Sequence, residues 1–205
     1  MDAHHPVDPT VRAQVLEQLA QIERRENVHI LYACESGSRG WGAASPDSDY
    51  DVRFIFVRRL NQYLRLYPPR DVIELVPGPV FDVNGWDLKK ALLLLARGNA
   101  TVLEWLSSPI VYRAEGGFLA QMQAAAAAVH RPERLFHHDV AMARGNYREY
   151  LQGEVVRAKK YLYVLRPVLN RFLEETFARL DEVDMPAAGE VDVSVLDSVF
   201  LEFVA

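Results

Sequence analysis

The sequence predicts an α/β (α+β) fold, in which a small mixed β-sheet is backed by helices and followed by a helical C-terminal lobe. Up to about residue 110, strand-length runs rich in β-branched and aromatic residues alternate with helical patterns. From about residue 118 onward the strand signals vanish and helical patterns dominate. We therefore expect a core domain over residues 1–110 and a helical region over residues 111–205.

The strands of the expected sheet are short and are separated by turn residues. Four runs have strand composition, at residues 28–34, 50–57, 71–76 and 80–83. Before them, apolar residues recur at spacings of three and four over residues 10–26, which predicts an amphipathic helix. Residues 35–48 hold three glycines, one proline and four serines, so we expect a long loop or a loop that enters a helix.

A capped helix is expected after the last of these strands. Asn84 can cap it, with Asp87 three positions later as in a capping box, and Gly98 suits the position just past its end. Further helical patterns lie at residues 101–106, 118–129, 133–152, 154–166, 170–182 and 192–204.

The composition is that of an ordinary globular protein with a mildly acidic balance. The formal net charge is −5, from 23 basic and 28 acidic residues, so nucleic acid can bind only through a local basic surface. Residues 142–171 are such a basic segment, with seven basic and two acidic residues, whereas residues 172–205 are strongly acidic. An RNA partner is therefore compatible with the charge pattern, but two solvated faces that offset each other are the simpler explanation.

The cysteine content, the N-terminal sequence and the length of the apolar runs indicate the expected cellular compartment. Its single cysteine, Cys34, excludes an internal disulfide and a cysteine-rich zinc site, and we expect it in the core. The N-terminus has no secretory signal pattern, and the longest apolar run is too short to cross a bilayer. We expect a cytoplasmic protein with no membrane partner.

Two aspartates carry the strongest chemical signal. Asp49 and Asp51 are two residues apart at the start of the run 50–57, so in a strand both carboxylates lie on one face, with Cα atoms about 6–7 Å apart. Two like charges this close repel, and a divalent cation removes the penalty. Oxygen-only ligands favour Mg²⁺ or Mn²⁺ over zinc, and such a pair can hold the metals used for phosphoryl transfer.

A glycine-rich turn precedes this acid pair by about ten residues. Gly37 and Ser38 follow a hydrophobic strand, and glycine lets backbone N–H groups approach a phosphate closely. The Ser38 hydroxyl and the Arg39 guanidinium are further candidate phosphate ligands. Neither the turn nor the acid pair is specific alone, but their order and spacing together favour a nucleotide site.

Together these residues resemble the DNA-polymerase-β-like nucleotidyltransferase superfamily, whose pattern is a GS turn followed by [ST]DxD. The matching residues are Gly37, Ser38, Gly42, Ser48, Asp49 and Asp51. Longer blocks resemble one bacterial and phage family, described as predicted nucleotidyltransferases of an RNA-repair pathway; they lie at residues 35–42, 45–57, 82–92, 103–112 and 159–167. Members of that family carry a further segment after the last block, whereas here Leu169 is followed directly by Asn170, so either this chain is shorter there or a stretch is absent.

The superfamily resemblance implies a third metal-ligating carboxylate within a hydrophobic–acid–hydrophobic triplet on a later strand. Asp82 in the triplet FDV fits this pattern, and Glu74 in IEL is its rival. We favour Asp82 because it directly precedes the expected capped helix; its alternative role is to cap that helix. The resemblance also implies a nucleoside triphosphate substrate, with Mg²⁺ or Mn²⁺ as cofactor.

Several basic residues are further candidates for binding the nucleotide. Arg53 lies two residues past Asp51 and so faces the same side of the strand, where it either neutralises a triphosphate or pairs with Asp51. Lys159, Lys160 and Tyr163 fall within a helical pattern and can hold phosphates or stack a base. The alternative for these three is a solvated helix face with the tyrosine packed inward.

The function expected from these features is metal-dependent transfer of a nucleoside monophosphate from a triphosphate to a hydroxyl acceptor. Asp49, Asp51 and Asp82 would hold the metal, and Asp82 is also the candidate general base. The acceptor is an RNA end, a protein side chain or a small molecule, and the family resemblance favours RNA. A nucleotide-binding module without catalytic activity is the non-enzymatic alternative.

Overall fold

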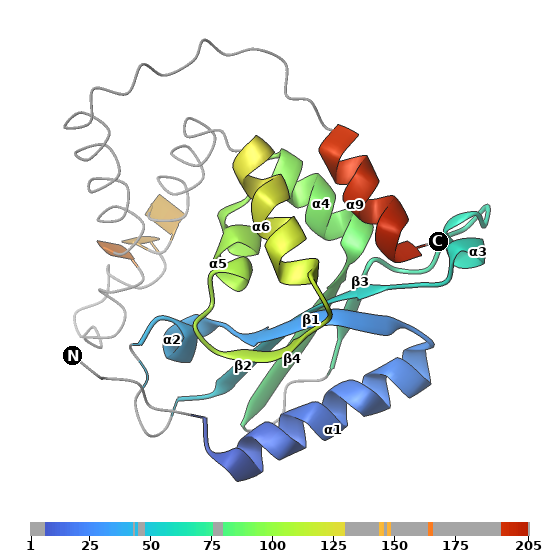
Figure 1. Cartoon of the computed structure of the whole chain (residues 1–205). Coiled ribbons are helices and arrows are strands. Elements are labelled where there is room, and N and C mark those ends of the chain that lie inside the picture. The colour runs from blue at the N-terminus through green and yellow to red at the C-terminus, as the bar shows by residue number, and fades with distance from the viewer. Residues whose placement is uncertain are drawn as a thin grey trace, which may run out of the picture.

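A computed structural model shows one mixed β-sheet with helices packed against both of its faces (Figure 1). It describes residues 7–42, 44, 48–75, 80–129 and 194–204, with short stretches at 144–145, 147–148 and 164–165. The strands are β1 (His29–Glu35), β2 (Tyr50–Val57), β3 (Val72–Glu74), β4 (Phe81–Asp87) and β5 (Val111–Ala114). The predicted fold class is confirmed, because these strands form a five-stranded sheet in the order β3-β4-β2-β1-β5.

The central strands of the sheet determine where the site lies. β2 pairs in parallel with β4, and the other three pairings are antiparallel. In the β2–β4 register, Asp51 lies opposite Asp82 and Arg53 lies opposite Asn84. Residues in register on neighbouring strands project to the same face, so this pairing brings two of the predicted acids together.

Each face of the sheet has its own apolar layer. α1 (Pro9–Glu26) covers one face, and its buried Val15, Leu19 and Ile22 cluster with strand residues such as Phe54 and Phe56. The other face is covered by α4 (Leu88–Ala96), α5 (Ala100–Leu106), α6 (Phe118–Val129) and α9 (Ser194–Val204). Cys34 is buried in this second layer, as predicted.

The predicted start of the capped helix was wrong. Asn84 lies inside β4, which runs on to Asp87, and α4 begins one residue later. Asp87 is the N-cap: its carboxylate accepts a hydrogen bond from the backbone N–H of Lys89 at 2.9 Å and another from the Tyr63 hydroxyl at 2.8 Å. Asp82 therefore lies near the start of a strand, five positions from the cap. Gly98 does lie just past the helix end, with φ of 73°.

The C-terminal half contributes more to the sheet than the sequence suggested. β5, which falls in the region expected to be all-helical, pairs with β1 at the edge of the sheet. α6 and α9 pack in the same apolar cluster as α4 and α5. The division at residue 110 stays a prediction, and the patterns between residues 130 and 193 fall almost wholly outside the described residues.

Two short helices complete the described chain. α2 (Gly37–Gly40) is a single turn after β1, and α3 (Leu60–Tyr63) follows β2. The segment 35–48 thus includes a helical turn, in agreement with the expectation of a loop entering a helix.

Gly85 offers a test of the parallel pairing of β2 and β4. It lies opposite Phe54 in register, and a Cβ added to it would lie 2.1 Å from the Phe54 ring, which is fully buried. We expect G85A to lower the free energy of unfolding by about 1–3 kcal/mol, because the ring has no free space to move into. Denaturant unfolding measures this.

The matched control is G116A, since a Cβ on Gly116 meets nothing within 4 Å. Its stability should stay within about 0.5 kcal/mol of the unsubstituted protein. Equal stabilities for G85A and G116A would contradict the observed register.

Candidate active site

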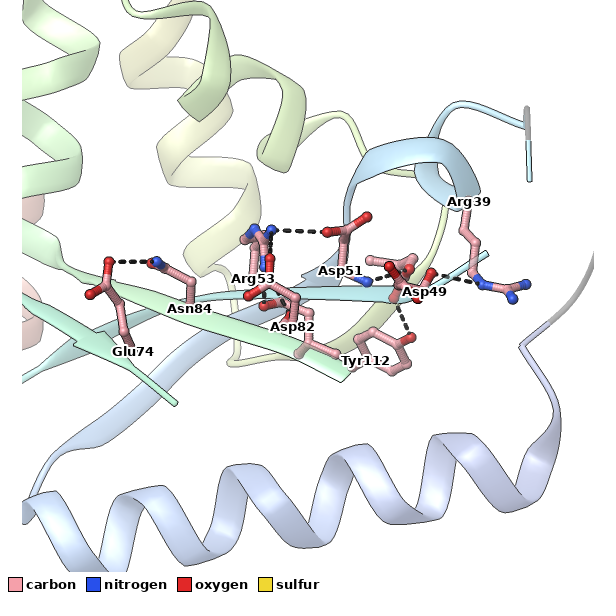
Figure 2. A network of polar contacts seen from close by, with 10 residues as sticks. Arg39, Asp49, Asp51, Arg53, Glu74, Asp82, Asn84 and Tyr112 are labelled. Carbon is pink, nitrogen blue, oxygen red and sulfur yellow. Dashed lines mark hydrogen bonds and ion pairs between the residues drawn. The ribbon is translucent and has the colours of Figure 1, made fainter. Parts of the chain in front are cut away.

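The centre of the site is a pair of carboxylates on neighbouring strands. Asp51 on β2 and Asp82 on β4 lie opposite each other, and the guanidinium of Arg53 lies between them (Figure 2). One guanidinium nitrogen of Arg53, Nη2, donates to Asp51 Oδ1 at 3.0 Å and to Asp82 Oδ2 at 2.7 Å. The structure therefore places Asp51, Arg53 and Asp82 in one cluster.

The exposure of these side chains shows where a ligand can enter. The Asp82 side chain is 43% exposed, that of Asp51 is 26% exposed and that of Arg53 is 17% exposed. The acids thus reach solvent, while the arginine lies deeper against the sheet. Its other nitrogen, Nη1, donates to the backbone carbonyls of Val52 at 3.1 Å and Asp82 at 2.9 Å.

The predicted glycine turn lies directly against Asp51. Gly37 has φ of 57°, and a Cβ added to it would lie 1.9 Å from Asp51 Oδ2. The backbone N–H of the preceding residue, Ser36, donates to the carbonyl of Asp51 at 2.8 Å. Ser38 is buried in the same turn. The close approach requires glycine at position 37, both for the left-handed backbone and for the space that the carboxylate occupies.

Arg39 contacts the backbone that leads into β2. Its guanidinium donates to the carbonyls of Ser48 at 2.7 Å and Asp49 at 3.3 Å, and its Cζ lies 4.0 Å from the centre of the Tyr50 ring. The side chain is largely buried in these contacts. The arrangement supports a role in positioning the Asp49 segment, and phosphate binding by Arg39 stays a prediction.

Asp49 is exposed and lies just before the first residue of β2. Within the described part of the chain, no group of three His, Cys, Asp or Glu side chains is arranged to hold a metal ion. The structure therefore brings two of the three predicted metal ligands together, Asp51 and Asp82.

The geometry favours Asp82 over Glu74 as the partner of Asp51. Glu74 lies on β3 opposite Asn84, and its carboxylate accepts a hydrogen bond from the Asn84 side chain at 3.2 Å. Asp82, in contrast, shares a guanidinium nitrogen with Asp51. The preference drawn from the sequence agrees with this placement, although its stated reason, adjacency to a capped helix, does not hold.

Glu35 lies beneath the acid pair, and the sequence analysis did not identify it as part of the site. It is fully buried at the end of β1, where Oε1 accepts from the backbone N–H of Asp51 at 2.9 Å and Oε2 accepts from the Tyr112 hydroxyl at 2.6 Å. Burial, opposed by these hydrogen bonds, raises the pKa of Glu35 to about 7. The sequence feature that could have pointed to Glu35 is its position directly after a continuous apolar strand.

The residues present fit a divalent cation. Asp51 and Asp82 lie in register on neighbouring strands and both are partly exposed. Two carboxylates this close repel each other, and a cation beside them relieves the repulsion, as the Arg53 guanidinium does in this structure. Their oxygen donors suit Mg²⁺ or Mn²⁺. Three further nucleotide-binding candidates, Lys159, Lys160 and Tyr163, lie outside the described residues.

We expect G37A to be markedly less stable than G42A. Both glycines have positive φ, but a Cβ on Gly42 meets nothing within 4 Å, whereas one on Gly37 collides with Asp51. Each substitution should lower the free energy of unfolding by about 1–3 kcal/mol, because an alanine strains the left-handed backbone. G37A should lower it by roughly 1 kcal/mol more, because the Asp51 carboxylate is displaced. Equal losses in denaturant unfolding would show that the turn does not press against Asp51.

Glu35 should make stability depend on pH. Its carboxyl keeps its proton up to about pH 7 in the folded protein but loses it near 4.5, its ordinary value, when unfolded. The unfolded state thus binds fewer protons between these pH values, so the free energy of unfolding falls as pH rises through this window.

E35Q cannot ionise and should remove this contribution. The unsubstituted protein should lose roughly 3 kcal/mol relative to E35Q between pH 4.5 and 8, from about 1.4 kcal/mol per unit of pKa shift. Unfolding curves of both proteins across this range measure the difference. A constant difference would contradict a raised pKa.

Comparison with known proteins agrees with the family resemblance seen in the sequence. A model of the RNA repair pathway DNA polymerase beta family (RlaP) matches residues 11–194. Uncharacterized protein YcgL of Bacillus subtilis (strain 168) is 44% identical over 159 residues, which cover 78% of this chain and 61% of that protein. The chain thus spans less than two thirds of the length of that relative.

Among the described residues, no helix combines the length and apolar character needed to cross a membrane. The family match extends from the first helix to the beginning of the last one and so includes both the sheet and the acid pair. This chain belongs to the RNA repair pathway DNA polymerase beta family.

Proposed function

We propose that this protein is a metal-dependent nucleotidyltransferase that moves a nucleoside monophosphate from a triphosphate to a hydroxyl acceptor. The observation that carries the proposal is the convergence of Asp51 and Asp82 beside the turn at Gly37. An acid pair on adjacent strands next to a glycine turn combines a cation site with a phosphate site. Membership of the polymerase beta family supports the same reaction class.

We assign the acidic side chains as ligands of the metal ion. Asp51 and Asp82, together with Asp49, would hold Mg²⁺ or Mn²⁺. When bound, such an ion neutralises triphosphate charge and lowers the pKa of the acceptor hydroxyl. Asp82 is the most exposed of the clustered side chains and is assigned as the group that accepts the hydroxyl proton.

The remaining groups position the nucleotide. The backbone of Gly37 and the hydroxyl of Ser38 are assigned to the β- and γ-phosphates, because Gly37 lies against the Asp51 carboxylate and Ser38 follows it in the same turn. Arg39 would keep the Asp49 segment in place through its two backbone contacts. The acceptor oxygen then attacks the α-phosphorus in line, the bond to the bridging oxygen breaks, and pyrophosphate leaves. Lys159, Lys160 and Tyr163 stay proposed ligands for phosphate and base.

An RNA end is the acceptor that we propose, since the family is assigned to an RNA repair pathway. The basic segment at residues 142–171 would supply the phosphate contacts that RNA binding needs. The same chemistry can transfer a nucleotide to a protein side chain or to a small molecule, and both outcomes are open in the experiment below. The remaining alternative is a protein that binds a nucleotide without transferring it. We propose that the protein acts in the cytoplasm.

The test is transfer from labelled nucleoside triphosphates to a pool of RNA, protein and small-molecule acceptors, followed by location of the label. D51N and D82N should lower transfer by at least about a hundredfold, because several kcal/mol of transition-state stabilisation depends on the acid pair. Transfer to RNA should also fall steeply with salt.

E74Q is the matched control, since it makes the same chemical change at an exposed acid on the adjacent strand β3. Its rate should stay near that of the unsubstituted protein. Full activity in D51N, at unchanged stability, would contradict the proposed function. Label found on protein or on a small molecule would show that this molecule, and not RNA, is the acceptor.

A further inference from the structure

Arg53 occupies the position between two carboxylates at which a bridging cation would bind. We propose that Arg53 is the built-in counter-cation of Asp51 and Asp82, and that a divalent ion binds this pair only by displacing its guanidinium. Arg53 thereby sets the metal concentration at which the site loads. This inference rests on the proposed function, because it requires that the pair binds a metal at all.

The hydrogen bonds of Arg53 define the competition. Nη2 lies 3.0 Å from Asp51 Oδ1 and 2.7 Å from Asp82 Oδ2. An ion such as Mg²⁺ holds carboxylate oxygens at about 2.0–2.1 Å, and Nη2 already lies in the space between these two oxygens. The nitrogen and the ion therefore cannot occupy the gap at the same time.

The charge of Arg53 makes the competition unavoidable. A guanidinium does not lose its proton in proteins, so it cannot neutralise itself when a second cation arrives. Its side chain is only 17% exposed, which limits screening by solvent. Two cations at one pair of carboxylates repel each other, and the more weakly held one must move.

The backbone contacts of Arg53 indicate how far it moves. Nη1 donates to the carbonyls of Val52 and Asp82, which belong to the strands and not to the carboxylates. Because the guanidinium is planar and Nη1 uses both of its N–H groups in these bonds, Nη2 cannot turn away from the acids while both bonds persist. Displacement therefore breaks these backbone bonds as well, and the whole guanidinium moves away from the acid pair.

The experiment is a titration of the full chain with Mn²⁺ alone, with free Mn²⁺ measured by electron paramagnetic resonance. R53Q should bind Mn²⁺ roughly tenfold more tightly than the unsubstituted protein, because the competing charge is removed. R59Q is the control for net charge: Arg59 is exposed and lies beyond the other end of β2. Its affinity should match that of the unsubstituted protein.

Two results would overturn the inference. If R53Q binds Mn²⁺ no more tightly than R59Q, the arginine does not compete, and weaker binding by R53Q would assign it to positioning the acids for the metal. D51N separates this failure from failure of the proposed function. Binding that is lost in D51N but equal in R53Q and R59Q rejects the role of Arg53 alone, whereas no binding by any protein rejects the metal site as well.

A second measurement covers the case in which R53Q does not fold without metal. In the unsubstituted protein, the Arg53 guanidinium makes four hydrogen bonds, which should slow rotation about its C–N bonds. Nitrogen-15 NMR of labelled arginine should show separate Nη signals for Arg53 that merge when diamagnetic Mg²⁺ is added. Signals that stay separate at saturating Mg²⁺ would overturn the displacement.

Discussion

The structure depends on one electrostatic constraint: two carboxylates face each other across a parallel pair of strands and must share a positive charge. Asp51 and Asp82 are in register on β2 and β4, so backbone hydrogen bonds hold them together whatever their charge state. Arg53 supplies the positive charge from β2 itself. The pairing of the central strands thus creates both the repulsion between the acids and the position of the group that relieves it.

The surroundings of the acid pair hold it in place. Glu35 accepts from the backbone N–H of Asp51 and from Tyr112, so it links β2 to the edge strand β5 through the end of β1. Gly37 packs directly against the Asp51 carboxylate, and Arg39 holds the chain that enters β2. Most of the polar groups near the site therefore bind the protein's own backbone, while Asp51 and Asp82 stay partly exposed to solvent.

The local pattern of apolar residues was sufficient to predict the bounds of one long helix and two strands. The helix of residues 9–26 and the strands at 29–35 and 50–57 agree with the predicted spans to within one or two residues. The β4–α4 junction was misjudged because Asn84 and Asp87 are both good capping residues, and only the pairing of β4 with β2 decides how long the strand continues. β5 was missed since its four residues form a strand only against β1.

For the site, residue spacing alone made Asp49, Asp51, Gly37 and Ser38 candidates, because ligands close in sequence are constrained by strand and turn geometry. Asp82 was singled out through the superfamily resemblance, and the reason given for preferring it, a capped helix directly after it, does not apply. The meeting of Asp82 with Asp51, the placement of Arg53 between them and the burial of Glu35 arise from contacts between segments 16 to 77 residues apart. Those contacts follow from strand order and register, which the sheet as a whole selects and no short stretch of sequence encodes.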